Sequence, residues 1–179
     1  MNEVLIVGSN GFIGSFLYKK LNSSYSCTGL DYGQKSTVDD YYSVDLTQSS
    51  GVRNFAENTP ICEIIIFLVG LAHKKGKRQE LDEFRCINKQ TLVNLLSALG
   101  KANKLPNKLI FASTISVYGE KMNQNIYNEE SNKSPFSPYA VTKLETEEYL
   151  LNNYNTQSWI LRFAPVYAPD FQLNINRRT

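Results

Sequence analysis

Tyr139 and Lys143 are the residues of this sequence whose types and spacing point most directly to chemistry. They stand four positions apart, so on a helix they project from the same face and their polar ends converge. A free tyrosine has a pKa of about 10, and it acts as a base at neutral pH only when a nearby cation stabilises its phenolate. Lys143 would be that cation, and the pair would suit redox chemistry at a carbon that bears a hydroxyl group. The alternative is an ordinary pair on the surface of a helix.

A glycine-rich segment near the N-terminus, Gly8-Ser9-Asn10-Gly11-Phe12-Ile13-Gly14, predicts a cradle for a dinucleotide. It follows the strand-like run Val4-Leu5-Ile6-Val7 and precedes a helical pattern, which is the setting that gives such a segment its meaning. There Gly8 makes the tight turn, Gly11 admits a pyrophosphate close to backbone amides, and Gly14 lets the helix pack on the strand. A generic turn before a buried helix is the alternative.

An acidic residue, Asp31, ends the second expected strand. A carboxylate at this position accepts hydrogen bonds from both adenosine ribose hydroxyls and repels a 2′-phosphate, so it favours NAD over NADP. Lys35 is close enough in sequence to keep NADP open. An aspartate that merely begins a turn with Gly33 is the competing interpretation.

These residues need a scaffold, and the rest of the chain predicts one. Apolar β-prone runs alternate with helical patterns, as in a parallel sheet covered on both faces. The expected strands lie near residues 3–7, 25–30, 42–45, 62–69, 107–112 and 157–162. The sequence therefore predicts an α/β fold of the Rossmann type, with a doubly wound, mostly parallel sheet and helices on both faces.

Three helices carry clear signals. One begins near Ser137-Pro138, where serine caps and proline suits the first turn, and it carries Tyr139 and Lys143. The other two have buried stripes. The stripe of the helix from Gly11 is expected to be Phe12, Ile13, Phe16, Leu17 and Leu21, and that of the helix from about Leu81 to Lys101 is expected to be Phe84, Ile87, Leu92, Leu95, Leu96 and Leu99.

Composition narrows the class of protein. The 179 residues fit one domain, and a net charge of only +2 shows no electrostatic footprint for nucleic acid. The longest apolar run, 61–72, is too short to span a bilayer, and the N-terminus does not resemble a signal peptide, so no membrane association and a cytoplasmic location are expected. No metal site is expected, because His73 is the only histidine. Cys27, Cys62 and Cys86 are interpreted as reduced structural thiols.

The order of these motifs resembles the extended short-chain dehydrogenase/reductases, specifically the NAD-dependent nucleotide-sugar epimerase/dehydratase group, over nearly the whole chain. The further matching segments are Asp45-Leu46, 67–72, Ile87-Asn88, 113–119 and 161–169. Phe67 stands where the family usually has a histidine. The resemblance implies Thr114, Tyr139 and Lys143 as catalytic residues, with Asn88 helping to order the active site. It places NAD against Gly8, Asn10, Gly11, Phe12, Ile13, Gly14, Asp31, Asp45, Leu46, Leu68, Val69, Gly70, Ala112, Ser113, Tyr139, Lys143 and Pro165.

The resemblance implies that the substrate is a nucleotide sugar, UDP-linked by expectation. Dehydratases of the group carry Asp-Glu after the catalytic Thr, whereas this chain has Ile115-Ser116, so dehydration is disfavoured. Epimerisation through a transient keto sugar is the leading expectation. The alternatives are a nucleotide-sugar keto-reductase or dehydrogenase, and a catalytically idle dinucleotide-binding module.

The resemblance also has implications for the domains of the chain and for its assembly into subunits. Residues 1–179 are expected to be the NAD-binding Rossmann domain, with most of the family's C-terminal substrate-binding lobe absent from this chain, which is either a fragment or a natural short form. Family members commonly pair through the long helix and the Tyr-Lys helix, so a homodimer is expected. The candidate surface residues, which are equally consistent with a core, are Leu92, Leu95, Leu96, Leu99, Tyr149 and Leu150.

Overall fold

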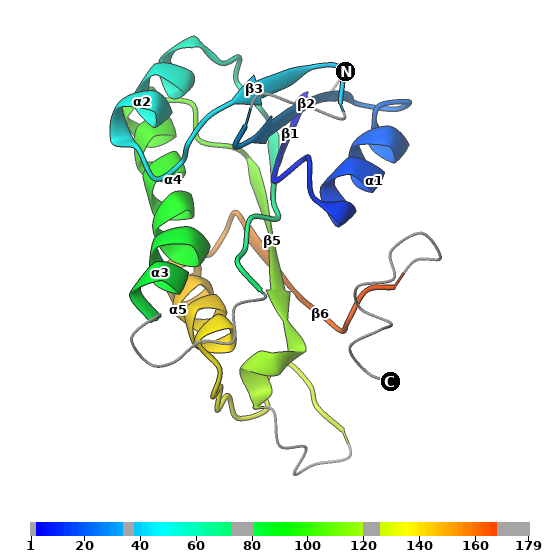
Figure 1. The fold of residues 1–179 in the computed structure, drawn as a ribbon, viewed down its shortest axis with the longest axis vertical. Coiled ribbons are helices and arrows are strands. Elements are labelled where there is room, and N and C mark those ends of the chain that lie inside the picture. The colour runs from blue at the N-terminus through cyan, green and yellow to red at the C-terminus, as the bar shows by residue number, and fades with distance from the viewer. Residues whose placement is uncertain (1–2, 34–37, 73–80, 120–125, 168–179) are drawn as a thin grey trace.

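A six-stranded parallel sheet forms the centre of the protein (Figure 1). The computed structural model describes residues 3–33, 38–72, 81–119 and 126–167. The strand order is β3-β2-β1-β4-β5-β6, so the chain winds outward from β1 in two directions and reverses between β1 and β4. The strands are β1 (Glu3–Val7), β2 (Ser26–Asp31), β3 (Tyr41–Ser43), β4 (Ile64–Phe67), β5 (Lys108–Thr114) and β6 (Ser158–Phe163).

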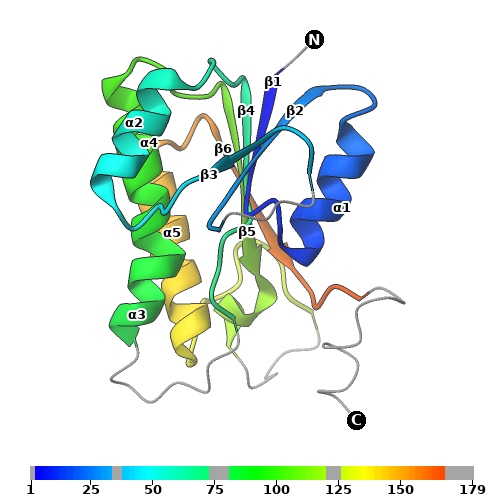
Figure 2. The same cartoon turned by 45° about the horizontal axis from the view of Figure 1, so that its top comes forward.

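Helices cover both faces of the sheet. Figure 2 shows α2, α4 and α5 on one face and α1 on the other, so the predicted doubly wound fold is confirmed. The α-helices are α1 (Phe12–Leu21), α2 (Ser49–Asn58), α3 (Leu81–Arg85), α4 (Thr91–Lys101) and α5 (Pro138–Asn153). A π-helical turn, η2 (Cys86–Gln90), joins α3 to α4, and a 3-10 turn, η3 (Ile115–Tyr118), follows β5. The expected helix from Leu81 to Lys101 is therefore interrupted at its middle.

Two apolar clusters lie on opposite faces because the side chains of β1 alternate. Val4 and Ile6 pack in the cluster beneath α1, and Leu5 and Val7 pack in the larger one beneath α2, α4 and α5. The expected dimer surface belongs to this larger core. Its members include Leu92, Leu95, Leu96, Leu99 and Leu150, with Tyr149 packed against it.

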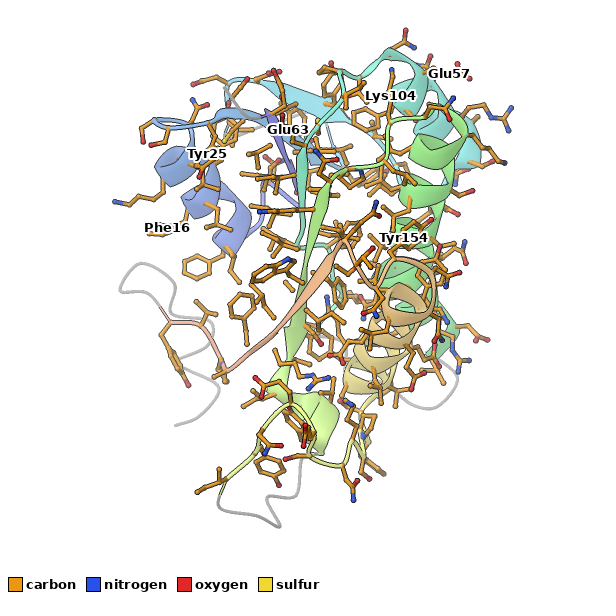
Figure 3. All side chains as sticks on the ribbon, turned by 180° about the vertical axis from the view of Figure 1, so that it is seen from behind. Phe16, Tyr25, Glu57, Glu63, Lys104 and Tyr154 are labelled. Atoms are coloured by element: carbon orange, nitrogen blue, oxygen red, sulfur yellow. The ribbon has the colours of Figure 1, made fainter. Side chains whose placement is uncertain are left out.

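The expected stripe of α1 is wrong at one position. Phe16 is 59% exposed, and Lys20 Nζ lies 5.8 Å from its ring centroid. Figure 3 labels Phe16 on the outer side of α1. Tyr18 is buried instead, and its hydroxyl accepts a hydrogen bond of 3.0 Å from the backbone N–H of Asp40. The tyrosine thus buries its ring and satisfies its polar end, which an apolar-only pattern cannot anticipate.

The chain segment after α4 returns to cap α2. Lys104 Nζ donates to the carbonyl oxygens of Glu57 at 2.7 Å and Thr59 at 2.8 Å, and Figure 3 shows Lys104 and Glu57 on adjacent segments. These carbonyls stand at the C-terminal end of the helix, where a cation is favourable. One lysine therefore ties α2 to the start of the β5 region.

The outer strand β6 presents apolar side chains to solvent. Ile160 packs in the larger core, so Trp159, Leu161 and Phe163 face the side of the sheet that carries α1. All three are exposed, Trp159 by 62%.

Cys27 and Cys62 are buried and Cys86 is exposed, and none is in a disulfide. Burial raises the pKa of the Cys62 thiol to about 11. None of the helices in the described part of the chain has the length and apolar content that a membrane span requires. Within the described ranges, no three His, Cys, Asp or Glu side chains gather as metal ligands would. His73 and Lys35 lie outside those ranges.

Replacing Gly14 with alanine is expected to destabilise the fold. A Cβ at this position would lie 2.2 Å from the carbonyl oxygen of Gly8 and 2.8 Å from Cα of Ser9, so α1 would have to move. We expect Gly14→Ala to lower the free energy of unfolding in urea by about 2 to 3 kcal/mol.

Gly51→Ala is the matched control. Gly51 is also helical, but a Cβ there would meet nothing closer than Val44 at 4.0 Å. Alanine is the better helix former by about 1 kcal/mol, so this variant should be as stable as the parent or more stable. Equal effects of the two substitutions would contradict the packing role of Gly14.

Candidate active site

The predicted site residues meet at the carboxyl edge of the sheet, where the strand order reverses. Gly8 follows β1, and Leu68 and Gly70 follow β4, the neighbouring strand. They line a cleft of about 450 Å³ that also takes in the ends of β5 and β6. Open α/β sheets bind ligands in this crevice.

The glycine loop packs closely against the backbone that follows β4. Gly8 has φ of +90°, and a Cβ on it would lie 3.1 Å from the backbone N of Val69. Gly11 N donates to Gly8 O at 3.1 Å, and Gly11 is the N-cap of α1. The N-terminus of α1 therefore faces the cleft with backbone N–H groups and no acidic side chain in its first turn, an arrangement that favours an anion.

Asp31 is tied to this loop from the end of β2. Its Oδ2 accepts from Asn10 N at 2.9 Å, and its Oδ1 accepts from Tyr32 N at 2.8 Å. Asn10 Nδ2 donates to the hydroxyl of Tyr41 at 3.2 Å. The carboxylate is thus fixed beside the glycine loop, as the spacing of the two motifs predicts.

A second cleft, of about 300 Å³, collects four more of the expected residues, whereas Asn10 lines neither cleft. Asp31, Asp45, Leu46 and Val69 line it. Asp45 Oδ1 accepts from the backbone N of Thr47 at 2.9 Å, so this side chain also holds the turn before α2. The walls of this cleft are mainly apolar and include the two carboxylates Asp31 and Asp45, a lining that suits a ligand with an apolar body and a few polar groups.

Lys143 lies buried at the centre of the site. Its Nζ donates to Ala112 O at 2.9 Å and to Val69 O at 3.3 Å, and lies 4.7 Å from the ring centroid of Phe111. A Cβ on Gly70 would come within 3.1 Å of this ammonium group. Burial lowers the pKa of Lys143 to about 7, against the opposing effect of Glu147. A small change in its surroundings therefore decides whether it is charged at neutral pH.

Tyr139 stands one turn before Lys143 on α5, and both line the larger cleft. The two side chains share a helix face, with Lys143 Nζ at 5.9 Å from the centroid of the Tyr139 ring. Burial raises the pKa of the Tyr139 phenol. Ser137 caps the helix as expected, because its Oγ accepts from Ala140 N at 3.3 Å.

Thr114 ends β5 and faces the same cleft. Its hydroxyl oxygen accepts from Ser116 N at 3.2 Å and lies 3.3 Å from Ser116 Oγ. Thr114 and Ser116 therefore place two hydroxyls together on the wall that Tyr139 also lines.

Asn88 sits in the π-helical turn and joins three segments. Its Oδ1 accepts from Leu71 N at 2.6 Å, and its Nδ2 donates to Thr142 Oγ1 at 2.9 Å. The hydroxyl of Thr146 donates to Asn88 O, which the wider π turn leaves available, at 3.2 Å. Single π turns inside α-helices are frequent at functional sites. Here the turn connects the segment after β4 to α5.

Phe67, at the family's usual histidine position, does not reach the cleft. It is fully buried, and its ring centroid lies 6.4 Å from that of Phe111. The side chain belongs to the core, whereas Leu68 and Gly70, just after it, line the cleft.

Sequence reasoning missed several residues of the two clefts. Most of them lie inside the matching segments, at positions to which no cofactor contact was assigned, or directly beside an expected residue, so treating each whole segment as cleft lining would have found them. In the larger cleft they are Ala72, Ile115, Ser116, Phe163, Ala164 and Val166, and in the smaller they are Tyr32, Val44, Thr47, Ile87 and Thr91.

Glu147 and Arg162 form a buried ion pair behind the site, and the sequence alone assigned a role to neither. Arg162 Nη2 donates to Glu147 Oε2 at 2.7 Å, and the Glu147 side chain is fully buried. The available signal was an acid four residues after Lys143, on the same helix face.

Comparison with known proteins identifies the family of this chain. The chain matches the NAD dependent epimerase/dehydratase family over residues 4–178, and it belongs to that family. The resemblance predicted from the motifs is confirmed.

Two curated bacterial relatives are about twice as long as this chain. The chain is 33% identical to the uncharacterized UDP-glucose epimerase YtcB of Bacillus subtilis, over 93% of this chain and 57% of YtcB. It is 30% identical to protein CapI of Staphylococcus aureus, over 93% of this chain and 55% of CapI. MoeE5, solved in complex with UDP-glucose and NAD, superimposes with a TM-score of 0.76 at 27% identity, over 94% of this chain and 56% of MoeE5. The chain thus spans little more than half the length of these proteins.

Removing the Asn88 side chain is expected to loosen the site. Asn88→Ala leaves the part-buried N–H of Leu71 and the buried hydroxyl of Thr142 without this partner, and an unmet buried polar group costs about 1 to 3 kcal/mol. We expect the free energy of unfolding to fall by about 2 kcal/mol or more, measured by urea denaturation. Gln90→Ala, in the same turn but exposed, should change it by less than about 0.5 kcal/mol. A similar loss in both variants would count against the linking role of Asn88.

Proposed function

We propose that this chain is the cofactor-binding and catalytic part of an NAD-dependent nucleotide-sugar epimerase. The observation that carries the proposal is that Thr114, Tyr139 and Lys143 line one cleft with the glycine loop. Proton-transfer groups and a dinucleotide cradle have a common purpose only if oxidation and reduction take place between them. Membership of the family supports the same activity.

The two clefts fit NAD. The glycine loop and the N-terminus of α1 present backbone N–H groups to a pyrophosphate, and the smaller cleft suits the adenine between Asp45-Leu46 and Val69. Asp31 stands between these regions, where it would accept from the ribose hydroxyls. Leu68, Gly70, Ala112, Ser113 and Pro165 would line the nicotinamide end.

NAD supplies reversible oxidation of the sugar's carbinol carbon. Tyr139 takes the proton of the sugar hydroxyl and returns it, and Thr114 holds the reacting oxygen by a hydrogen bond. The Lys143 ammonium would stabilise the phenolate of Tyr139 and would hold the nicotinamide ribose. Without this positive charge the buried phenol stays protonated at neutral pH, because burial raises its pKa.

Epimerisation fits the cleft better than dehydration. Eliminating water requires an additional acid and base beside the reacting carbon, and the two residues after Thr114 are Ile115 and Ser116. Net reduction of a keto sugar uses the same three catalytic residues and is the second candidate.

The names of the relatives support a UDP-linked substrate. YtcB is described as a UDP-glucose epimerase, and MoeE5 was solved with UDP-glucose.

We further propose a homodimer through the outer surfaces of α3 and α5, since the leucines of α4 are committed to the core. A cytoplasmic location is proposed from the three unpaired cysteines.

Asp31 is expected to set the preference for NAD. In calorimetric titrations the chain should bind NAD more tightly than NADP, because the carboxylate repels a 2′-phosphate. Asp31→Asn should lower the NAD-to-NADP affinity ratio about tenfold or more, equivalent to about 1.4 kcal/mol. Asp39→Asn makes the same charge change at an exposed position and should leave the ratio unchanged. Binding of neither dinucleotide by the parent would sink the cofactor assignment.

Tyr139 is expected to be essential for turnover. With NAD and UDP-glucose present, the C4 epimer should appear in proton NMR spectra, and Tyr139→Phe should slow it about 100-fold or more. Tyr149→Phe, on the same helix but packed against the core, should retain activity. Turnover by the Tyr139→Phe protein at the parent rate would overturn the assignment of the base.

A further inference from the structure

A buried carboxylate, that of Glu147, lies behind the site and is held on both sides. Arg162 donates to it from Nε at 3.1 and 3.2 Å and from Nη2 at 2.7 Å. The hydroxyl of Ser113, on β5, donates to Glu147 Oε1. The carboxylate therefore has a single position, fixed by α5, β5 and β6.

Burying this ion pair costs free energy that burying apolar side chains would not. Taking a carboxylate out of water costs several kcal/mol, and buried ion pairs are often replaceable by apolar residues without loss of stability. Glu147 is fully buried, and the Arg162 side chain is only 14% exposed. A buried charge at such a place calls for a role that an apolar pair cannot perform.

The neighbouring group that needs a negative charge is Lys143, one helical turn earlier on the same face of α5. Its ammonium faces neutral groups on the elements packed against it. These are the carbonyl oxygens of Val69 and Ala112, the ring of Phe111, and the phenol of Tyr139. Asn88 and Gly70, close by, are also uncharged. Within the part of the chain that the structure describes, Glu147 is the charged group that acts on Lys143, and it is itself paired with Arg162.

We propose that Glu147 is a positioning residue for the reaction: held by Arg162 and Ser113, its carboxylate keeps the Lys143 ammonium protonated beside Tyr139. The proposal rests on the proposed role of Lys143 as the cation of the site. Burial lowers the pKa of Lys143 to about 7, and the charge of Glu147 opposes that effect. Without Glu147 the pKa falls further, and the lysine becomes neutral at the pH where a charged one is required.

The same carboxylate also reaches the other wall of the cleft. Ser113, which donates to Glu147, directly precedes Thr114. Arg162 donates from Nη1 to the hydroxyl of Tyr118 at 2.6 Å, at the end of the 3-10 turn that Thr114 caps. Glu147 thus links the helix that carries Tyr139, to which it belongs, with the strand that carries Thr114.

The test is a pH titration of the Lys143 side chain by NMR, with ¹³C-labelled lysine and assignment by a Lys143→Arg variant. No cofactor is added, so the outcome does not depend on whether NAD binds. In the parent the Lys143 resonance should titrate with a midpoint near 7. In Glu147→Gln, which keeps the shape and loses the charge, the midpoint should fall by about one pH unit or more.

Glu148→Gln is the matched control, because it removes the same charge from the adjacent, exposed position of α5. It should leave the midpoint in place. A folded Glu147→Gln protein whose Lys143 titrates as in the parent would overturn the proposal, and so would an equal shift in the control. A purely structural role for Glu147 would change the stability without this selective shift.

Glu147→Gln leaves the guanidinium of Arg162 buried without its anion, which threatens folding. The double variant Glu147→Gln, Arg162→Met removes both charges and keeps a side chain of similar length at each position. It should fold and show a downward shift of the Lys143 midpoint that is smaller than in Glu147→Gln, because losing the Arg162 cation offsets part of the effect of losing the anion. A folded double variant whose midpoint rises would also overturn the proposal.

Discussion

The structure depends on a lysine ammonium buried at the carboxyl ends of two parallel strands. Lys143 extends from α5 to the carbonyl oxygens of Val69 and Ala112, just after β4 and near the end of β5. These two strands are neighbours in the sheet, so one cation holds the helix over both of their ends. The approach is tight at Gly70, because a Cβ there would lie 3.1 Å from the ammonium and would push it by a few tenths of an ångström. The lysine proposed as the cation of the site is in this way also the anchor of its own helix.

A second close approach, at Gly8 and Gly14, serves the same edge of the sheet. Backbone carbonyl and Cα atoms occupy the space where a Gly14 Cβ would stand, so α1 begins directly against the loop that follows β1. The cleft therefore has a rigid floor of backbone, with polar side chains entering from α5 and β5. Rigid backbone suits a large cofactor, whereas side chains held by hydrogen bonds suit proton transfer.

The parts of this architecture that follow from local pattern could be predicted from the sequence. Alternating apolar runs indicate the six strands, and the Ser137-Pro138 cap locates the start of α5. Three features were hidden because they depend on contacts between distant segments. Tyr18 is buried through a hydrogen bond to the backbone of Asp40, and the π turn at Asn88 exists to reach Leu71 and Thr142. The partner of Glu147 lies 15 residues away on another element.

Burial acts in opposite directions on the two members of the Tyr139-Lys143 pair. It raises the pKa of the phenol and lowers that of the ammonium, so both changes favour the neutral forms. A neutral pair cannot transfer a proton at neutral pH, because the phenol holds its proton and the amine provides no charge to release it. The site therefore requires charge from outside the pair. Glu147 supplies it from one side by retaining the proton on Lys143, and the positive nicotinamide ring of NAD would supply it from the other. On this argument the cofactor and the buried carboxylate act on the same equilibrium, and the base becomes competent only when both are in place.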